Sequence, residues 1–140
     1  MAGESDFNKR ICGALNCYHA IRIEDMYSTG IPDINFTGGW IESKDIPATR
    51  APKRADTIVR LDHYTPQQRA WHMRRTLAGG KVYVALEVAD AFFLFDARMA
   101  AAHLGVDWTL ADLSRRALIW SKRFDGIALR RHIKLDCRLP

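Results

Sequence analysis

The segment GIPDINFTGGWIESK, residues 30–44, contains two short apolar runs joined by Gly38-Gly39. Two runs joined by a pair of glycines are typical of a β-hairpin. Side chains two residues apart on a strand project from the same face, so we expect Glu42 and Lys44 to lie together. A tight hairpin also brings Asp33 alongside them. Two carboxylates and a cation meeting at a sheet edge suit a divalent-metal site that activates water near a phosphate.

A second motif follows the hairpin. Residues 64–71 are YTPQQRAW, and residues 79–84 are GGKVYV. Together with Pro32-Asp33 and Glu42-Ser43-Lys44, these segments resemble the PD-(D/E)XK nuclease superfamily, in particular its VRR-NUC-like branch. The resemblance covers about residues 4–96, and stand-alone nucleases of this kind are common in bacteriophages.

The resemblance implies a metal site. Asp33 and Glu42 are its expected ligands, the backbone carbonyl of Ser43 is a third, and the hard oxygen donors favour Mg²⁺ or Mn²⁺. Glu4 is a candidate for a second metal position, and the alternative is an acidic residue that complements the dipole of the first helix. Glu24 is a weaker candidate for the rim of the site. Without the second motif, Asp33 would be interpreted as a turn residue and Glu42 as an exposed strand residue.

The resemblance also implies two catalytic groups beside the metal. Lys44 is expected to orient or deprotonate the attacking water, or to stabilise charge on the phosphate; the alternative is an ion pair worth little in water. Gln68 is expected to hydrogen-bond the water or a metal ligand. Gln67 is its rival one position earlier, and the Gln-x-x-Trp pattern ending at Trp71 selects Gln68. We interpret Trp71 as a core residue.

Positive charge is the next feature. The net charge of +5 and the pI near 9.4 indicate affinity for polyanions. Basic residues follow the hairpin directly, and we expect these to contact DNA, whereas those of the last quarter of the chain fit a solvated surface equally well. The predicted DNA-contacting residues are Arg50, Lys53, Arg54, Arg60 and Arg69.

The chain of 140 residues predicts one domain with a core of residues 4–96 and a helical extension of residues 97–140. The fold class is α/β (α+β), a mixed sheet flanked by helices with the αβββαβ order of a restriction-endonuclease-like core. Thr65 as N-cap and Pro66 as first helical residue predict a helix that ends at Gly79-Gly80. The other expected helices are 4–17, 97–104 and 109–122, the other expected strands are 18–23, 82–88 and 91–95, and 45–62 is an irregular connection.

Several classes of protein are excluded. The three cysteines and the histidines have no zinc-ligand spacing, and no Gly-rich phosphate-binding motif occurs. No apolar run is long enough to cross a bilayer, and the polar start differs from a signal peptide. We therefore expect no membrane association and an intracellular protein, in the host cytoplasm if a phage encodes it.

These observations predict a Mg²⁺- or Mn²⁺-dependent DNA endonuclease. Proteins of the VRR-NUC-like branch imply selectivity for branched DNA or four-way (Holliday) junctions, and two sites facing opposing strands imply a homodimer. Two alternatives remain open: a non-catalytic DNA-binding module on a nuclease fold, and a sequence-specific restriction-type nuclease. For the latter, the chain has little left over to contact bases in the major groove.

Overall fold

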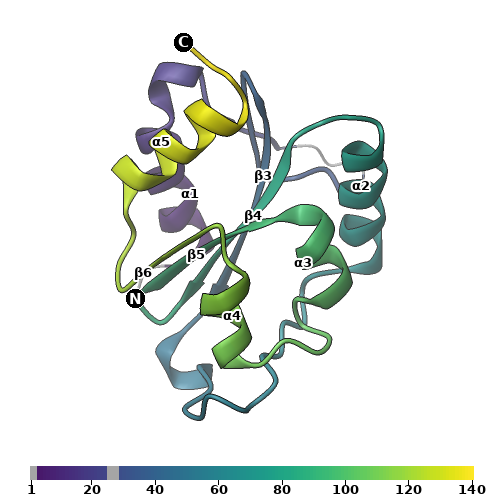
Figure 1. Ribbon diagram of the computed structural model, residues 1–140, viewed down its shortest axis with the longest axis vertical. Helices are drawn as coiled ribbons and strands as arrows, with labels where there is room; N and C mark the ends of the chain where they lie inside the picture. The colour runs from purple at the N-terminus through teal and green to yellow at the C-terminus, as the bar shows by residue number, and fades with distance from the viewer. Residues whose placement is uncertain (1–2, 25–28) are drawn as a thin grey trace.

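The computed structural model describes residues 3–24 and 29–140. One six-stranded sheet runs in the order β1-β2-β3-β4-β5-β6, and helices cover both of its faces (Figure 1). The chain is therefore a mixed α+β fold, and its first elements follow the expected αβββαβ order. The strands are β1 (Ile21–Arg22), β2 (Ile34–Phe36), β3 (Gly39–Ile46), β4 (Val82–Val88), β5 (Ala91–Asp96) and β6 (Ile119–Ser121). The helices are α1 (Glu4–Ala14), α2 (Pro66–Leu77), α3 (Ala97–His103), α4 (Leu110–Arg116) and α5 (Gly126–Asp136), with 3₁₀ turns at Asn16–Tyr18 and Ala48–Arg50.

The predicted hairpin is present as β2 and β3, which pair antiparallel from Phe36 opposite Gly39 to Ile34 opposite Ile41. β3 then pairs in parallel with β4 from Trp40 to Ile46, and α2 lies between the two strands in the chain. Because β2 is short, the part of β3 beyond Ile41 pairs with β4 alone among the described residues. Among the described residues, one edge of β3 thus has no strand partner where Glu42 and Lys44 lie, and we call it the open edge of β3.

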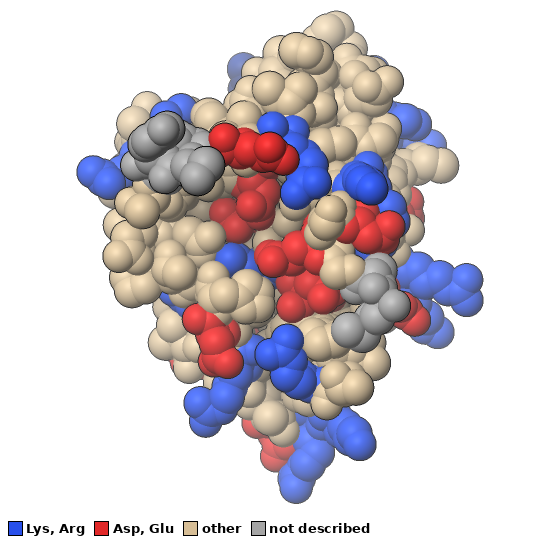
Figure 2. All heavy atoms as spheres, turned by 180° about the vertical axis from the view of Figure 1, so that it is seen from behind, with Lys and Arg blue, Asp and Glu red and all other residues tan. Residues whose placement is uncertain are grey.

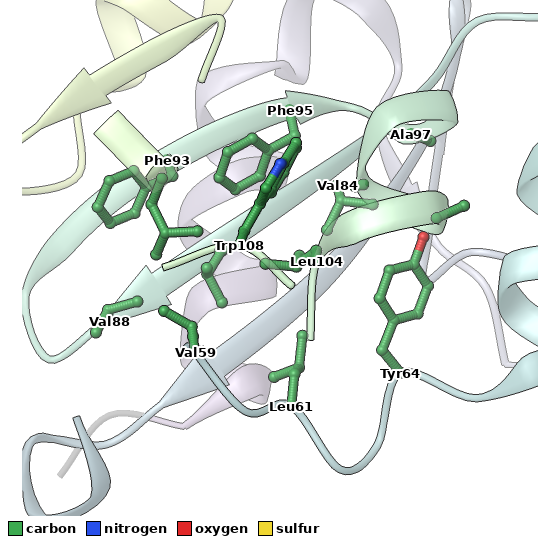
Figure 3. Close-up of a cluster of buried hydrophobic side chains, with 14 of the residues drawn as sticks. Val59, Leu61, Tyr64, Val84, Val88, Phe93, Phe95, Ala97, Leu104 and Trp108 are labelled. Carbon is green, nitrogen blue, oxygen red and sulfur yellow. The ribbon is translucent and has the colours of Figure 1, made fainter. Parts of the chain in front are cut away.

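Two hydrophobic cores hold the layers together. One lies between the sheet and helices α2, α3 and α4, where Phe95 packs against Trp108 at a ring-centroid distance of 5.2 Å (Figure 3). The other lies between the sheet and helices α1 and α5, and Phe7 and Ile133 are fully buried in it. The C-terminal extension is therefore part of the core.

Three predicted boundaries were wrong. The first helix ends at Ala14 instead of residue 17, and a 3₁₀ turn follows it up to Tyr18. The strand expected over 18–23 is reduced to β1, because His19 adopts a left-handed conformation with φ of 55°. The helix expected over 109–122 ends at Arg116, and Ile119–Ser121 pairs with β5 as the edge strand β6.

No helix within residues 3–24 and 29–140 has both the length and the apolar character needed to cross a bilayer.

Candidate active site

Asp33 and Glu42 face each other across the hairpin. Continuing the β2–β3 register by one residue beyond Ile34 places Asp33 opposite Glu42. The Asp33 carboxylate oxygen Oδ2 accepts hydrogen bonds from the Ser43 amide at 3.0 Å and the Ser43 hydroxyl at 3.1 Å. The N–H and C=O groups of one strand residue point to the same side. The Ser43 carbonyl is therefore directed toward the open edge of β3, on the side of Asp33.

Glu42 and Lys44 project from the same face of β3, as predicted, and both are almost fully buried. The Lys44 ammonium nitrogen lies 3.4 Å from Glu42 Oε2. It also donates hydrogen bonds to the backbone carbonyl of His63 at 2.8 Å and to Gln68 Oε1 at 3.0 Å. A buried lysine with three oxygen partners is held in a single position, which a freely moving surface lysine would not be.

The start of α2 fixes Gln68 in this site. Its Oε1 accepts a hydrogen bond from the Thr65 amide at 3.0 Å, and the Thr65 hydroxyl accepts one from the Gln68 amide at 3.2 Å. This reciprocal pair is a capping box, which pairs amides that a helix start leaves free. The Gln68 Nε2 also lies 3.4 Å from Glu42 Oε2. Gln68 therefore contacts both buried charges, whereas Gln67 is exposed.

Gly30, which precedes the hairpin, packs tightly against the backbone of α2. Gly30 has a φ of 90°, which L side chains rarely adopt, and a Cβ at this position would lie 2.4 Å from the Gln67 carbonyl oxygen. Only glycine permits both the backbone conformation and the approach. This contact places the Pro32-Asp33 segment next to the first turn of α2.

Burial and the neighbouring Asp33 raise the pKa of Glu42 to about 9, and Lys44 opposes the shift. The pKa of Glu4 is also raised, by burial and by the nearby carboxylates of Asp33 and Asp45, against the effect of Lys44. Glu4 is therefore within electrostatic range of Asp33 and Lys44, but no group of three acidic side chains arranged to hold a metal occurs among the described residues. Two carboxylates near one another in a buried setting favour a bound cation, which would remove their repulsion.

The oxygen atoms of this site are of the kind that could bind a divalent cation. The Oε1 atom of Glu42 is buried and has no hydrogen-bond partner among the described residues. Oxygen atoms of Asp33, Glu42 and the Ser43 backbone match the ligands that Mg²⁺ and Mn²⁺ prefer. Within the described parts of the chain, no group of three or more His, Cys, Asp or Glu side chains is arranged to hold a metal. A metal held here would therefore need oxygen ligands besides the side chains of Asp33 and Glu42, such as the Ser43 carbonyl.

The remaining candidates lie around the site or away from it. Arg50 and Arg60 line a cavity of about 240 Å³ with Asp45 and His63, next to Lys44. Lys53 and Arg54 are exposed in the following loop, and Glu24 is exposed after β1. On the face opposite to that in Figure 1, acidic side chains gather near the centre, and Lys and Arg side chains surround them (Figure 2).

Arg69 has a different environment from the one predicted. Its guanidinium donates hydrogen bonds to the carbonyls of Tyr64 at 3.2 Å and Ala101 at 3.0 Å, and its Cζ lies 4.0 Å from the centroid of the Tyr64 ring. These contacts join α2 to α3. Arg69 therefore has a structural role, and its contact with DNA stays a prediction.

His72 is a site residue that the sequence reasoning missed. It is fully buried on α2, with Nε2 3.8 Å from Glu42 Oε1 and Nδ1 2.7 Å from the hydroxyl of Tyr64. Burial, with a smaller contribution from Lys44, lowers the pKa of His72 to about 4. The spacing of Gln68 and His72, four residues apart on one helix, was the available signal.

Searches of the sequence against protein-family models and against curated proteins found no significant match. The resemblance to the PD-(D/E)XK superfamily therefore depends on the motifs themselves and on how their residues are placed.

Proposed function

We propose that this chain is a Mg²⁺- or Mn²⁺-dependent DNA endonuclease that hydrolyses phosphodiester bonds. The observation that supports it most is the convergence of Asp33, Glu42, Lys44 and Gln68 from three segments of the chain. Lys44 Nζ lies 3.4 Å from Glu42 Oε2 and 3.0 Å from Gln68 Oε1. Chance occurrences of the short motifs would not require these side chains to meet.

In this proposal Asp33, Glu42 and the Ser43 carbonyl would hold the metal, and Glu4 would be the candidate ligand of a second one. A bound divalent cation lowers the pKa of water and neutralises charge on the phosphate. The Lys44 ammonium group lies 3.4 Å from Glu42 Oε2, so in this proposal its charge would stabilise the negative charge that develops on the phosphate during attack. Gln68 holds Lys44 and Glu42 in register through one amide group, so the start of α2 keeps the catalytic groups together.

The substrate proposal rests on charge. Arg50, Lys53, Arg54 and Arg60 are exposed in the segment that follows β3, which supports their proposed contacts with DNA phosphates. Selectivity for branched DNA and a homodimer with two sites remain part of the proposal, and both derive from the resemblance. In that reading the chain acts on DNA inside a cell.

The test measures cleavage of linear, flap and four-way DNA in the presence of Mg²⁺ or Mn²⁺, by the wild type and by the variants Asp33→Asn and Glu42→Gln. We expect cleavage by the wild type and a loss of at least 100-fold in either variant, because each removes a metal ligand. Equal cleavage by the variants would reject the assignment of the site. Failure of the pure wild-type protein to cut any of the substrates would reject the nuclease.

A non-catalytic DNA-binding module is the second candidate. It is favoured by the absence, within the described residues, of three clustered His, Cys, Asp or Glu side chains. Calorimetry with Mn²⁺ separates the two proposals: DNA binding that weakens with salt, in a protein that takes up no Mn²⁺, would support the module.

A further inference from the structure

Helix α2 presents two side chains to the two oxygens of one carboxylate. Gln68 Nε2 lies 3.4 Å from Glu42 Oε2, and His72 Nε2 lies 3.8 Å from Glu42 Oε1. Residues four apart lie on the same face of a helix, so one rigid element brackets the Glu42 carboxylate. Lys44 contacts the same oxygen as Gln68, so His72 is the one polar partner that the described contacts give to Oε1.

We propose that His72, held by Tyr64, is a positioning residue that orients Glu42 for the metal. This inference rests on the proposed function, because it assigns a role in the same metal site. His72 is fully buried and its Nε2 lies 3.8 Å from Glu42 Oε1, so it would affect the reaction through that carboxylate and does not itself contact DNA.

The hydrogen bond to Tyr64 holds Nδ1 of His72, and the tautomer of the ring decides whether Nε2 faces Glu42 as a donor. A neutral imidazole has one N–H donor and one acceptor. The Tyr64 hydroxyl lies 2.7 Å from Nδ1, so when Tyr64 donates to Nδ1 the ring proton is on Nε2, opposite Glu42. With an ionised Glu42, this is the arrangement that places a donor against the carboxylate. Tyr64 therefore acts on Glu42 through the orientation of the His72 ring.

Both atoms that face each other lack another partner. Glu42 Oε1 and His72 Nε2 are buried and make no hydrogen bond to any of the described residues. Their separation exceeds a hydrogen bond, and a carboxylate movement of about 1 Å brings them within range. Residues that hydrogen-bond a metal ligand from behind typically change metal affinity by about 10–100-fold.

The experiment measures Mn²⁺ affinity of the full chain by calorimetry, with DNA cleavage as a second readout. His72→Leu removes the ring nitrogen and keeps an apolar side chain, while His72→Gln returns an amide N–H near the position of Nε2. Tyr64→Phe removes only the hydroxyl that holds the ring. Thr76→Val is the matched control, because Thr76 is one turn further along α2 and also has a buried, unpartnered side-chain oxygen.

We expect His72→Leu to weaken Mn²⁺ binding by about 10–100-fold and His72→Gln to keep most of the wild-type affinity. The Mn²⁺ affinity of Tyr64→Phe should lie between those of the two His72 variants. Thr76→Val should bind Mn²⁺ as the wild type does. Cleavage by His72→Leu should fall at limiting Mn²⁺ and recover at saturating Mn²⁺, a dependence that lost packing alone does not produce. Thermal unfolding without metal identifies any variant that does not fold. If His72→Leu does not fold, the Mn²⁺ affinities of Tyr64→Phe and His72→Gln test the proposal.

Three results would overturn the inference. Unchanged Mn²⁺ affinity in His72→Leu and Tyr64→Phe, in a wild type that binds and cleaves, would reject the role of His72 and leave the nuclease standing. Equal losses in His72→Leu and His72→Gln would assign His72 to packing. A wild type that binds no Mn²⁺ would reject the metal site and the positioning role together.

Discussion

Replacing Gly30 with alanine tests how the chain brings Asp33 to α2. Gly30 has a φ of 90°, and a Cβ there would lie 2.4 Å from the carbonyl oxygen of Gln67. Gly79, just beyond the end of α2, has a φ of 97°, but a Cβ there would have nothing within 4 Å. Gly79→Ala is therefore a matched control with a similar backbone cost and no collision.

The two costs can be separated. A left-handed backbone costs an L residue about 1–2 kcal/mol, which is the whole effect expected for Gly79→Ala. Overpacking adds about 1–3 kcal/mol, so Gly30→Ala should lower the free energy of unfolding by roughly 2–5 kcal/mol. Urea unfolding followed by tryptophan fluorescence measures both variants on the same scale.

The position of Gly30 also predicts an effect on the site. Relief of the collision moves residues 30–33 away from Gln67, so Gly30→Ala should weaken Mn²⁺ binding while Gly79→Ala leaves it unchanged. Equal losses of stability in the two variants would refute the steric reasoning. Undiminished Mn²⁺ binding by a destabilised Gly30→Ala would refute its link to Asp33.

Four further variants test the contacts of individual charges. Lys44→Met should lower cleavage by about 100-fold or more while Mn²⁺ binding is retained; loss of Mn²⁺ binding in calorimetry would contradict a purely catalytic role. Arg69→Lys should lower the free energy of unfolding by about 1–3 kcal/mol and leave the salt dependence of DNA binding unchanged. Arg54→Ala should instead reduce the slope of log K for DNA binding against log salt concentration by about one. A reduced slope in Arg69→Lys and an unchanged slope in Arg54→Ala would support Arg69 as the DNA contact. The pKa of Glu42 in the folded protein is about 9, above its ordinary value near 4.5, so without metal the stability that this group provides is complete below pH about 4.5 and is lost as pH rises toward 9. Glu42→Gln lacks this loss and should gain in stability relative to the wild type across that window in pH-dependent thermal unfolding; parallel pH profiles would contradict the shifted pKa.

Local patterns in the sequence predicted the parts of the site that depend on short range. The strand period of two places Glu42 and Lys44 on one face, and the Gly38-Gly39 turn returns the chain so that Asp33 lies opposite. Thr65 and Pro66 mark the first turn of α2, which fixes Gln68. These features follow from backbone geometry within a few residues, so no knowledge of the tertiary fold was needed.

Tertiary contacts explain what the sequence did not show. His72 becomes significant only because α2 packs over β3 and brings it to Glu42, thirty residues away in the chain. The charge of Arg69 suggested DNA, yet its guanidinium binds carbonyls of α3. The apolar residues Leu118, Ile119 and Trp120 fit a helix or a strand equally well, and the open edge of β5 determines that they form β6.

The arrangement around Glu42 bears on the proposed metal site, because this carboxylate is buried and one of its oxygens makes no hydrogen bond. Burial and Asp33 oppose its ionisation, while Lys44 and Gln68 contact one oxygen and leave the other unpaired toward His72. A fully satisfied carboxylate would gain little from a cation, and a solvated one would hold it weakly. The fold instead keeps Glu42 poorly compensated in a position that α2 and β3 fix from both sides. In the proposed function, a divalent cation bound beside Glu42 would therefore gain electrostatic stabilisation that solvent does not already supply.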